Sequence, residues 1–170
     1  MEDLLEVGER VLRDSSHIDP AHGSAETATV LFEAATGRSV AESPLTAQLP
    51  QRARERYLSF VARRAAGEPV AFITGSVRFC GIDIRVRPGI FVPRPSSEFL
   101  VMEAATRARP TPASVIVDLC TGSGAIALAL GKELPTAEVW GVDISLDAVR
   151  QASANARRLR IPARFRVSDL

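Results

Sequence analysis

The chain has 170 residues, enough for one hydrophobic core of ordinary size or for two small ones. Its 21 basic and 20 acidic residues nearly cancel, so net charge gives no support for a general nucleic-acid-binding or membrane-surface protein. No apolar run approaches the ~20 residues of a membrane-spanning helix, and Cys80 and Cys120 have no metal-binding or redox spacing. We therefore expect a reduced, cytoplasmic protein with no membrane partner and no bound metal.

Residues 1–67 predict a small bundle of helices. Apolar residues recur with helical spacing in three segments, of which the second begins at Ser24 and ends at Gly37 and the third runs from Pro50 to Gly67. The side chains expected to face the core are Leu4, Val7, Val11 and Leu12 in the first segment and Tyr57, Leu58, Val61 and Ala65 in the third.

Residues 68–95 predict a β-hairpin followed by an extended arm. Ile82, Ile84 and Val86 alternate with charged residues, which is the period of a strand with one buried face. A glycine at position 81 and the pair Pro88-Gly89 indicate turns, and the prolines at 93 and 95 disfavour helix before them.

Residues 96–170 alternate between helical and strand patterns, which predicts an α/β domain with a parallel, doubly wound (Rossmann-like) sheet. The expected strands are SVIVDL, AEVWGVDI and ARFRVSDL, and Ser145 is expected to cap the helix after the second strand. VIV is apolar at successive positions, so we expect this strand to be buried on both sides, with helices on both faces of the sheet.

The predicted sheet has few strands for such a fold. Its first strand is usually central, yet only three strands are expected, which leaves one apolar edge open. We therefore expect the 170 residues to be the front part of a longer protein. By itself the chain is expected to fold poorly at the edge Val115–Leu119, or to pair that edge with another chain in a non-native contact.

The stretch DLCTGSGAIA, residues 118–127, follows the first of these strands and predicts a glycine loop that leads into a helix. Gly122, Gly124 and Ala127 fit the G-x-G-x-x-G/A pattern of nucleotide cofactor sites, where glycines let the backbone approach the ligand. Asp143 ends the next strand, 21 residues after Gly122, where a carboxylate accepts hydrogen bonds from ribose hydroxyls. This spacing suits any cofactor that contains ribose.

Asp118 helps to distinguish between cofactors. Its carboxylate, four residues before Gly122, would repel a pyrophosphate and attract a sulfonium or an ammonium group. The loop therefore favours an adenosine cofactor that carries positive charge and no phosphate, and S-adenosylmethionine has that chemistry. The alternative that the glycine pattern leaves open is an NAD-dependent oxidoreductase.

Several motifs occur together in one family. GEPVAFITGSVRFCGIDIRVRPGIFVPRPSSEFLV followed by VIVDLCTGSGAIALAL resembles the protein-(glutamine-N5) methyltransferases that modify peptide chain release factors. The resemblance covers nearly the whole chain. It implies a helical partner-binding domain (residues 1–67), a hairpin and linker arm (68–95) and the first half of a class I methyltransferase domain (96–170). The implied activity is S-adenosylmethionine-dependent methylation of the glutamine in a release factor's Gly-Gly-Gln loop, which belongs to translation termination.

The resemblance also assigns cofactor contacts by position. The residues expected around the methionine part are Cys120, Thr121, Gly122, Ser123 and Gly124. Asp143 would hold the ribose, and Asp169 or Leu170 would lie beside the adenine. Arg94, Ser97 and Glu98 match the arm that covers the pocket, although the family's Pro-Arg-Pro-Glu-Thr-Glu reads PRPSSE here.

One family motif, the Asn-Pro-Pro-Tyr that grips the substrate amide, has no match in the sequence. In the family it orients the lone pair of the amide nitrogen, so catalysis is mostly positioning. The chain is therefore expected to bind cofactor weakly and to transfer nothing, and no catalytic residue is assigned. Two further alternatives are a methyltransferase that acts on nucleic acid or a small metabolite, and a non-catalytic, partner-binding role for the helical bundle.

Overall fold

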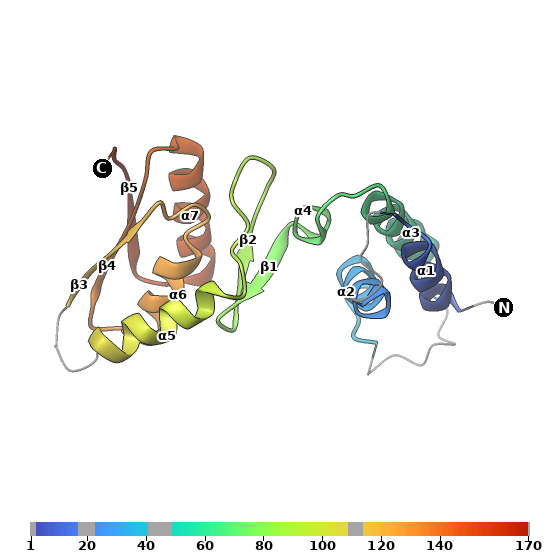
Figure 1. Cartoon of the computed structure of the whole chain (residues 1–170), viewed down its shortest axis with the longest axis horizontal. Coiled ribbons are helices and arrows are strands. Elements are labelled where there is room, and N and C mark those ends of the chain that lie inside the picture. The colour runs from blue at the N-terminus through green and yellow to red at the C-terminus, as the bar shows by residue number, and fades with distance from the viewer. Residues whose placement is uncertain (1–2, 17–22, 41–48, 109–113, 170) are drawn as a thin grey trace. The chain divides into compact units, whose positions relative to one another are not determined.

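The computed structural model describes residues 3–16, 23–40, 49–108 and 114–169. They form two compact units, which we call the helical unit (Met1–Thr74) and the sheet unit (Gly75–Leu170). Figure 1 shows both along the chain. Among the described helices, none has the length and apolar character needed to cross a membrane.

The helical unit contains the three expected helices and a fourth, short one. Their bounds are α1 Leu4–Arg13, α2 Ser24–Thr36, α3 Gln51–Ala65 and α4 Val70–Thr74. The side chain of Asp3 caps α1 by accepting from the N–H of Leu5, and Gly37 ends α2 at a φ of 69°, a left-handed conformation that suits glycine. The predicted ends of α2 are thereby confirmed.

Two of the predicted core positions in this unit are wrong. Val11 is 40% exposed and Leu58 is 42% exposed, whereas Phe60 is only 7% exposed. The buried stripe of α3 runs through Tyr57, Phe60 and Val61, and Leu58 falls beside it because each residue rotates the helix by about 100°. Leu12 and Tyr57, both 0% exposed, are core residues as predicted.

The sheet unit begins with an antiparallel hairpin and continues as an α/β domain. The hairpin strands are β1 Ser76–Phe79 and β2 Ile82–Arg85. The elements that follow are α5 Ser97–Ala108, β3 Val115–Leu119, α6 Ala125–Glu133, β4 Glu138–Asp143, α7 Leu146–Leu159 and β5 Ala163–Val167. Strands β3, β4 and β5 are parallel and adjacent in that order, which confirms the Rossmann-like arrangement.

The expectation of helices on both faces of the sheet is wrong for the described residues. Figure 1 shows α6 and α7 on the same side of the strands. Right-handed crossovers that step in one direction, from β3 to β4 and on to β5, place their helices on one face. On this face the ring of Phe165 lies close to Gly124, at the start of α6, and to Gly141.

The prediction that the first strand of the sheet is buried on both sides is therefore also wrong. Val115, Val117 and Leu119 in β3 are 64%, 50% and 55% exposed, while Asp118, on the other face, is buried. Strand β3 pairs only with β4 among the described residues, which confirms the expected open edge. Apolar side chains at successive positions are typical of a strand that is covered on both faces. Among the described residues, only one face of β3 is covered.

Candidate functional site

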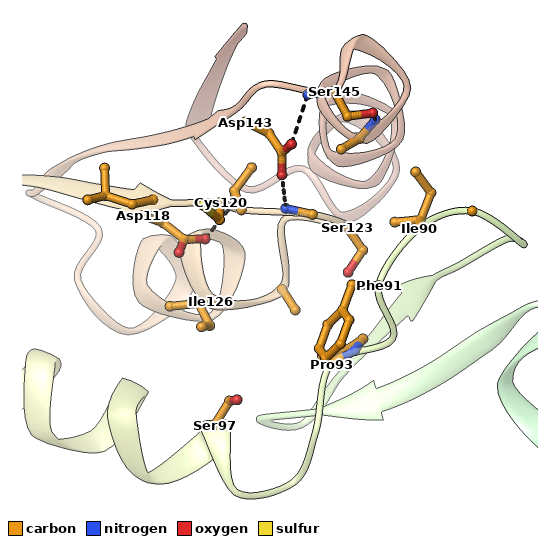
Figure 2. A pocket seen from close by; sticks show the side chains of 16 residues that line it. Ile90, Phe91, Pro93, Ser97, Asp118, Cys120, Ser123, Ile126, Asp143 and Ser145 are labelled. Carbon is orange, nitrogen blue, oxygen red and sulfur yellow. Dashed lines mark hydrogen bonds between the residues drawn. The ribbon is translucent and has the colours of Figure 1, made fainter. Parts of the chain in front are cut away.

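A cavity of about 490 Å³ lies in the sheet unit, at the carboxyl ends of β3 and β4. Open parallel sheets bind ligands in this position because the loops that leave the strands diverge there. The loop between β3 and α6 forms one wall, and the arm of residues 89–93 forms another. Figure 2 shows the two walls facing each other, with Ser97 of α5 below them.

The β3–α6 loop has a tight, left-handed backbone. Cys120, Gly122 and Gly124 have φ values of 57°, 54° and 83°. The N–H of Thr121 donates to the carbonyl of Val142, which fixes the loop to the end of β4. The two glycines are required for different reasons. A Cβ at Gly122 would meet no atom closer than 3.9 Å, so backbone conformation alone favours glycine, whereas a Cβ at Gly124 would lie 2.8 Å from that of Ala152.

Asp143 connects this loop to the start of α7. Its Oδ2 accepts from the N–H of Gly122 at 2.9 Å, and its Oδ1 accepts from the N–H of Ser145 at 2.9 Å (Figure 2). Ser145 in turn caps α7, because its hydroxyl accepts from the N–H of Ala148, as predicted. Asp143 also lines the cavity, and each carboxylate oxygen has lone-pair capacity for a further donor.

Asp118 places a second carboxyl group at the floor of the cavity. It is 9% exposed, and its Oδ2 accepts from the hydroxyl of Thr121 at 2.6 Å and from the N–H of Ala127 at 3.2 Å. Burial raises the pKa of Asp118, the two hydrogen bonds lower it, and the nearby charge of Asp143 raises it, with a net upward direction. Two acidic groups at one cavity favour a ligand with positive charge.

The arm contributes an aromatic side chain to the opposite wall. Ile90 is buried, but Phe91 is 66% exposed although it lines the cavity. The guanidinium of Arg94 lies 5.6 Å from the centre of the Phe91 ring, a cation–π distance. Glu98 lies away from this wall, where its carboxylate accepts from the N–H of Cys80 at 2.8 Å and fastens the hairpin turn to α5.

The structure brings together most of the residues that the sequence singled out. The predicted site residues that line the cavity are Ser97, Asp118, Cys120, Thr121, Gly122, Ser123 and Asp143. Arg94, Gly124 and Asp169 are not among its lining residues. Asp169 is exposed just after β5, and Leu170 lies outside the described residues. The cofactor contacts of all these residues stay predictions.

Several lining residues escaped sequence reasoning. They are Gly89, Ile90, Phe91, Pro93, Leu119, Ala125, Ile126, Ser145 and Ala148. The apolar segment GIFV between Pro88 and Pro93 was the available signal, because such a segment outside a strand or helix needs a surface to cover. Ser145 was identified only as a helix cap, yet its position at the N-terminus of α7 also brings it to the cavity.

Comparisons with known proteins agree with this architecture. Residues 3–75 match the family described as PrmC N-terminal domain, and residues 116–170 match a methyltransferase domain family. The chain is 44% identical over 124 residues to the release factor glutamine methyltransferase of Burkholderia pseudomallei, a match that covers 73% of this chain and 42% of that protein.

Two further relatives carry the same name. The protein from Koribacter versatilis is 46% identical over 116 residues, covering 68% of this chain and 41% of its own length. The protein from Streptomyces coelicolor is 47% identical over 111 residues, covering 64% and 40%. The chain thus spans about two fifths of the length of these curated relatives. Together, the two domain matches and these identities show that the chain is similar to release factor glutamine methyltransferases over most of its length.

Proposed function

We propose that the cavity binds S-adenosylmethionine and that the protein serves N5-methylation of a glutamine side chain in a peptide chain release factor. The observation that carries the proposal is the charge of the cavity. Asp118 and Asp143 lie on either side of the glycine loop, and no arginine or lysine is among the described lining residues. A pyrophosphate would meet two acidic groups there, whereas a sulfonium or an ammonium group would be attracted.

The residues of the chain fit the parts of this cofactor. Asp143 would accept hydrogen bonds from the ribose hydroxyls while it keeps the backbone bonds that orient it. The loop Cys120–Gly124 would surround the methionine part, and the buried Asp118 would stabilise positive charge beside it. Asp169 or Leu170 would lie near the adenine. Arg94 and Ser97 belong to the segment that would cover the site, with Phe91 as an apolar wall.

When bound, the cofactor supplies an electrophilic methyl group on a sulfonium centre. The chain contributes cofactor orientation and a partly desolvated pocket, which reduce the entropy lost when the reacting groups meet. The helical unit and the hairpin would hold the release factor in the cytoplasm and present its Gly-Gly-Gln loop. The sequence contains no Asn-Pro-Pro-Tyr, so we expect these 170 residues to bind cofactor without transferring the methyl group.

Isothermal titration of the chain with S-adenosylhomocysteine and with NADH tests the cofactor class. S-adenosylhomocysteine is expected to bind and NADH is not, because only NADH carries a pyrophosphate into the acidic cavity. Preferential binding of NADH would reject the methyltransferase assignment in favour of an oxidoreductase.

The acceptor needs a separate experiment. The reading frame is sequenced past the codon for Leu170, and its product is incubated with radiolabelled S-adenosylmethionine and a release factor. Label is expected in the release factor and not in a variant whose Gly-Gly-Gln glutamine is replaced by alanine. Label in a nucleic acid or a small metabolite instead would show a related methyltransferase with another substrate.

A further inference from the structure

Asn155 is a buried polar residue of α7 that lies outside the cavity lining. It is 1% exposed and makes three hydrogen bonds. Its Oδ1 accepts from the N–H of Arg85 at 3.1 Å, and its Nδ2 donates to the carbonyl of Arg85 at 3.0 Å and to that of Ser123 at 3.0 Å. An amide can satisfy this pattern because it presents an acceptor and two donors at once.

The two bonds to Arg85 occupy the free edge of the hairpin. In an antiparallel pair, successive residues turn their N–H and C=O groups to opposite edges of the strand. At Arg85, both groups bond to Asn155, while Val86 donates its N–H across the hairpin to the carbonyl of Gly75. The Asn155 side chain therefore takes the place of a further strand at the point where β2 ends and the arm begins.

Asn155 belongs to a row of polar contacts between α7 and this part of the hairpin, which we call the polar seam. Gln151 donates to the carbonyl of Arg85 at 3.1 Å, Asp147 pairs with Arg87 at 3.1 Å, and Arg158 donates to the carbonyl of Asp83. Residues 147, 151, 155 and 158 follow one stripe of the helix, since they are separated by three or four positions.

Within the seam, Asn155 is the residue whose hydrogen bonds also reach the β3–α6 loop, which we call the cofactor loop. Ser123, its third partner, lies between the two glycines of the loop and lines the cavity. From Arg85 the chain continues into the arm. There, the Cβ of Phe91 lies 3.9 Å from the position that a Cβ added to Gly122 would take, so the arm is close to the loop. The buried amide of Asn155 thus bonds both to Arg85, where the arm starts, and to Ser123, in the middle of the cofactor loop.

We propose that Asn155 is a positioning residue that fixes the arm relative to the cofactor loop, and that it thereby sets the affinity of the cavity for an adenosine cofactor. This inference rests on the proposed function. Losing Asn155 would leave every lining residue in the sequence intact, but it would remove the hydrogen bonds that connect the start of the arm to the loop. Binding would then have to order both walls, and the entropy lost would appear as weaker affinity.

The test compares the wild-type chain with Asn155→Leu, which keeps the number and branching of the side-chain heavy atoms and removes all three hydrogen bonds. The control Gln151→Ala removes one seam bond to Arg85 and leaves Ser123 untouched. A second control, Val149→Ala, weakens packing in the same helix at a residue that is 8% exposed. Each is titrated with S-adenosylhomocysteine at a temperature where circular dichroism shows it to be folded, and amide exchange is followed at residues 86–93 and 120–124.

Asn155→Leu is expected to raise the Kd at least about tenfold, the change that corresponds to ~1.4 kcal/mol, and to increase exchange at both segments together. Gln151→Ala and Val149→Ala are expected to change the Kd less than about threefold, since neither breaks the bond to the loop. A folded Asn155→Leu chain with wild-type affinity and wild-type exchange would overturn the inference, as would equal effects of Val149→Ala.

Failure of the wild-type chain to bind S-adenosylhomocysteine would count against the proposed function instead. Exchange in the ligand-free variants would still decide the role of Asn155, because the arm and the loop are expected to loosen together without any ligand.

Discussion

Replacing Asp143 with alanine tests the site most directly, because one carboxylate both holds the loop and lines the cavity. The substitution removes the acceptors for the N–H groups of Gly122 and Ser145, both bonded at 2.9 Å. A hydrogen bond to a charged group contributes about 1.5–3 kcal/mol. Asp143 is only partly buried, so water replaces some of this, and we expect a net loss of about 2 kcal/mol for the sheet unit. In a unit of this size, each kcal/mol lowers Tm by roughly 4–8 °C.

The substitution is also expected to weaken ligand binding, by a comparable free energy. In the proposed site, the variant would lose the hydrogen bonds to the ribose, and it would also lose the two bonds to backbone N–H groups that order the loop. Loss of one charge-assisted bond, at about 1.5–3 kcal/mol, raises the Kd for S-adenosylhomocysteine by one to two orders of magnitude. Thermal unfolding followed by circular dichroism and isothermal titration measure the two effects on the same sample.

The matched control is Glu138→Ala at the opposite end of the same strand. Glu138 makes an exposed ion pair with Arg164 at 2.7 Å, and such pairs contribute about 0–1 kcal/mol. Glu138→Ala should leave the affinity unchanged and should shift the Tm by no more than a few degrees. An unchanged Kd in Asp143→Ala would refute the ribose assignment, and an unchanged Tm would refute the reasoning about the two bonds to backbone N–H groups.

Three further substitutions test the packing and the buried acids. In Gly141→Ala the new Cβ would lie 2.5 Å from the Phe165 ring, so urea unfolding should show a loss of about 1–3 kcal/mol, and wild-type stability would contradict the geometry. Burial raises the pKa of Asp118, so the wild-type chain should lose stability relative to Asp118→Asn as pH rises above about 4, the usual range of an aspartate. An opposite trend between pH 4 and 7 would show that the ionised form is favoured. Burial raises the pKa of Tyr57 to about 12, and its hydroxyl has no hydrogen-bond partner among the described residues. Tyr57→Phe should therefore be at least as stable as the wild type at pH 7. Unlike the wild type, it should not lose stability between pH 10 and 12. A variant that is less stable at pH 7 would mean that the hydroxyl has a partner.

Sequence patterns were sufficient where the determinant is local. The glycine loop, the capping hydroxyl of Ser145 and the end of α2 at Gly37 each depend on backbone conformation within a few residues. The separation of Asp143 from Gly122 also predicted their proximity, because parallel strands place their carboxyl ends at one edge. In all, the sequence identified seven of the sixteen residues that line the cavity.

Other features depend on contacts between distant segments. Asn155 lies 70 residues from Arg85, and nothing in the local pattern of α7 distinguishes a buried asparagine from an exposed one. Leu58 and Phe60 are both apolar, and only packing against the other helices decides which is buried. The exposure of Val115 and Val117 follows from which strands and helices cover the sheet, a property that the strand's own sequence does not contain.

The polar seam has a consequence for how the hairpin can vary. Three residues of the seam, Gln151, Asn155 and Arg158, bond to backbone groups of β2, and only the pair between Asp147 and Arg87 uses a hairpin side chain. A hydrogen bond to a backbone group does not depend on which side chain that residue has. The outward side chains of the hairpin are therefore free to be redesigned for a new protein partner, while α7 keeps the arm in register with the loop.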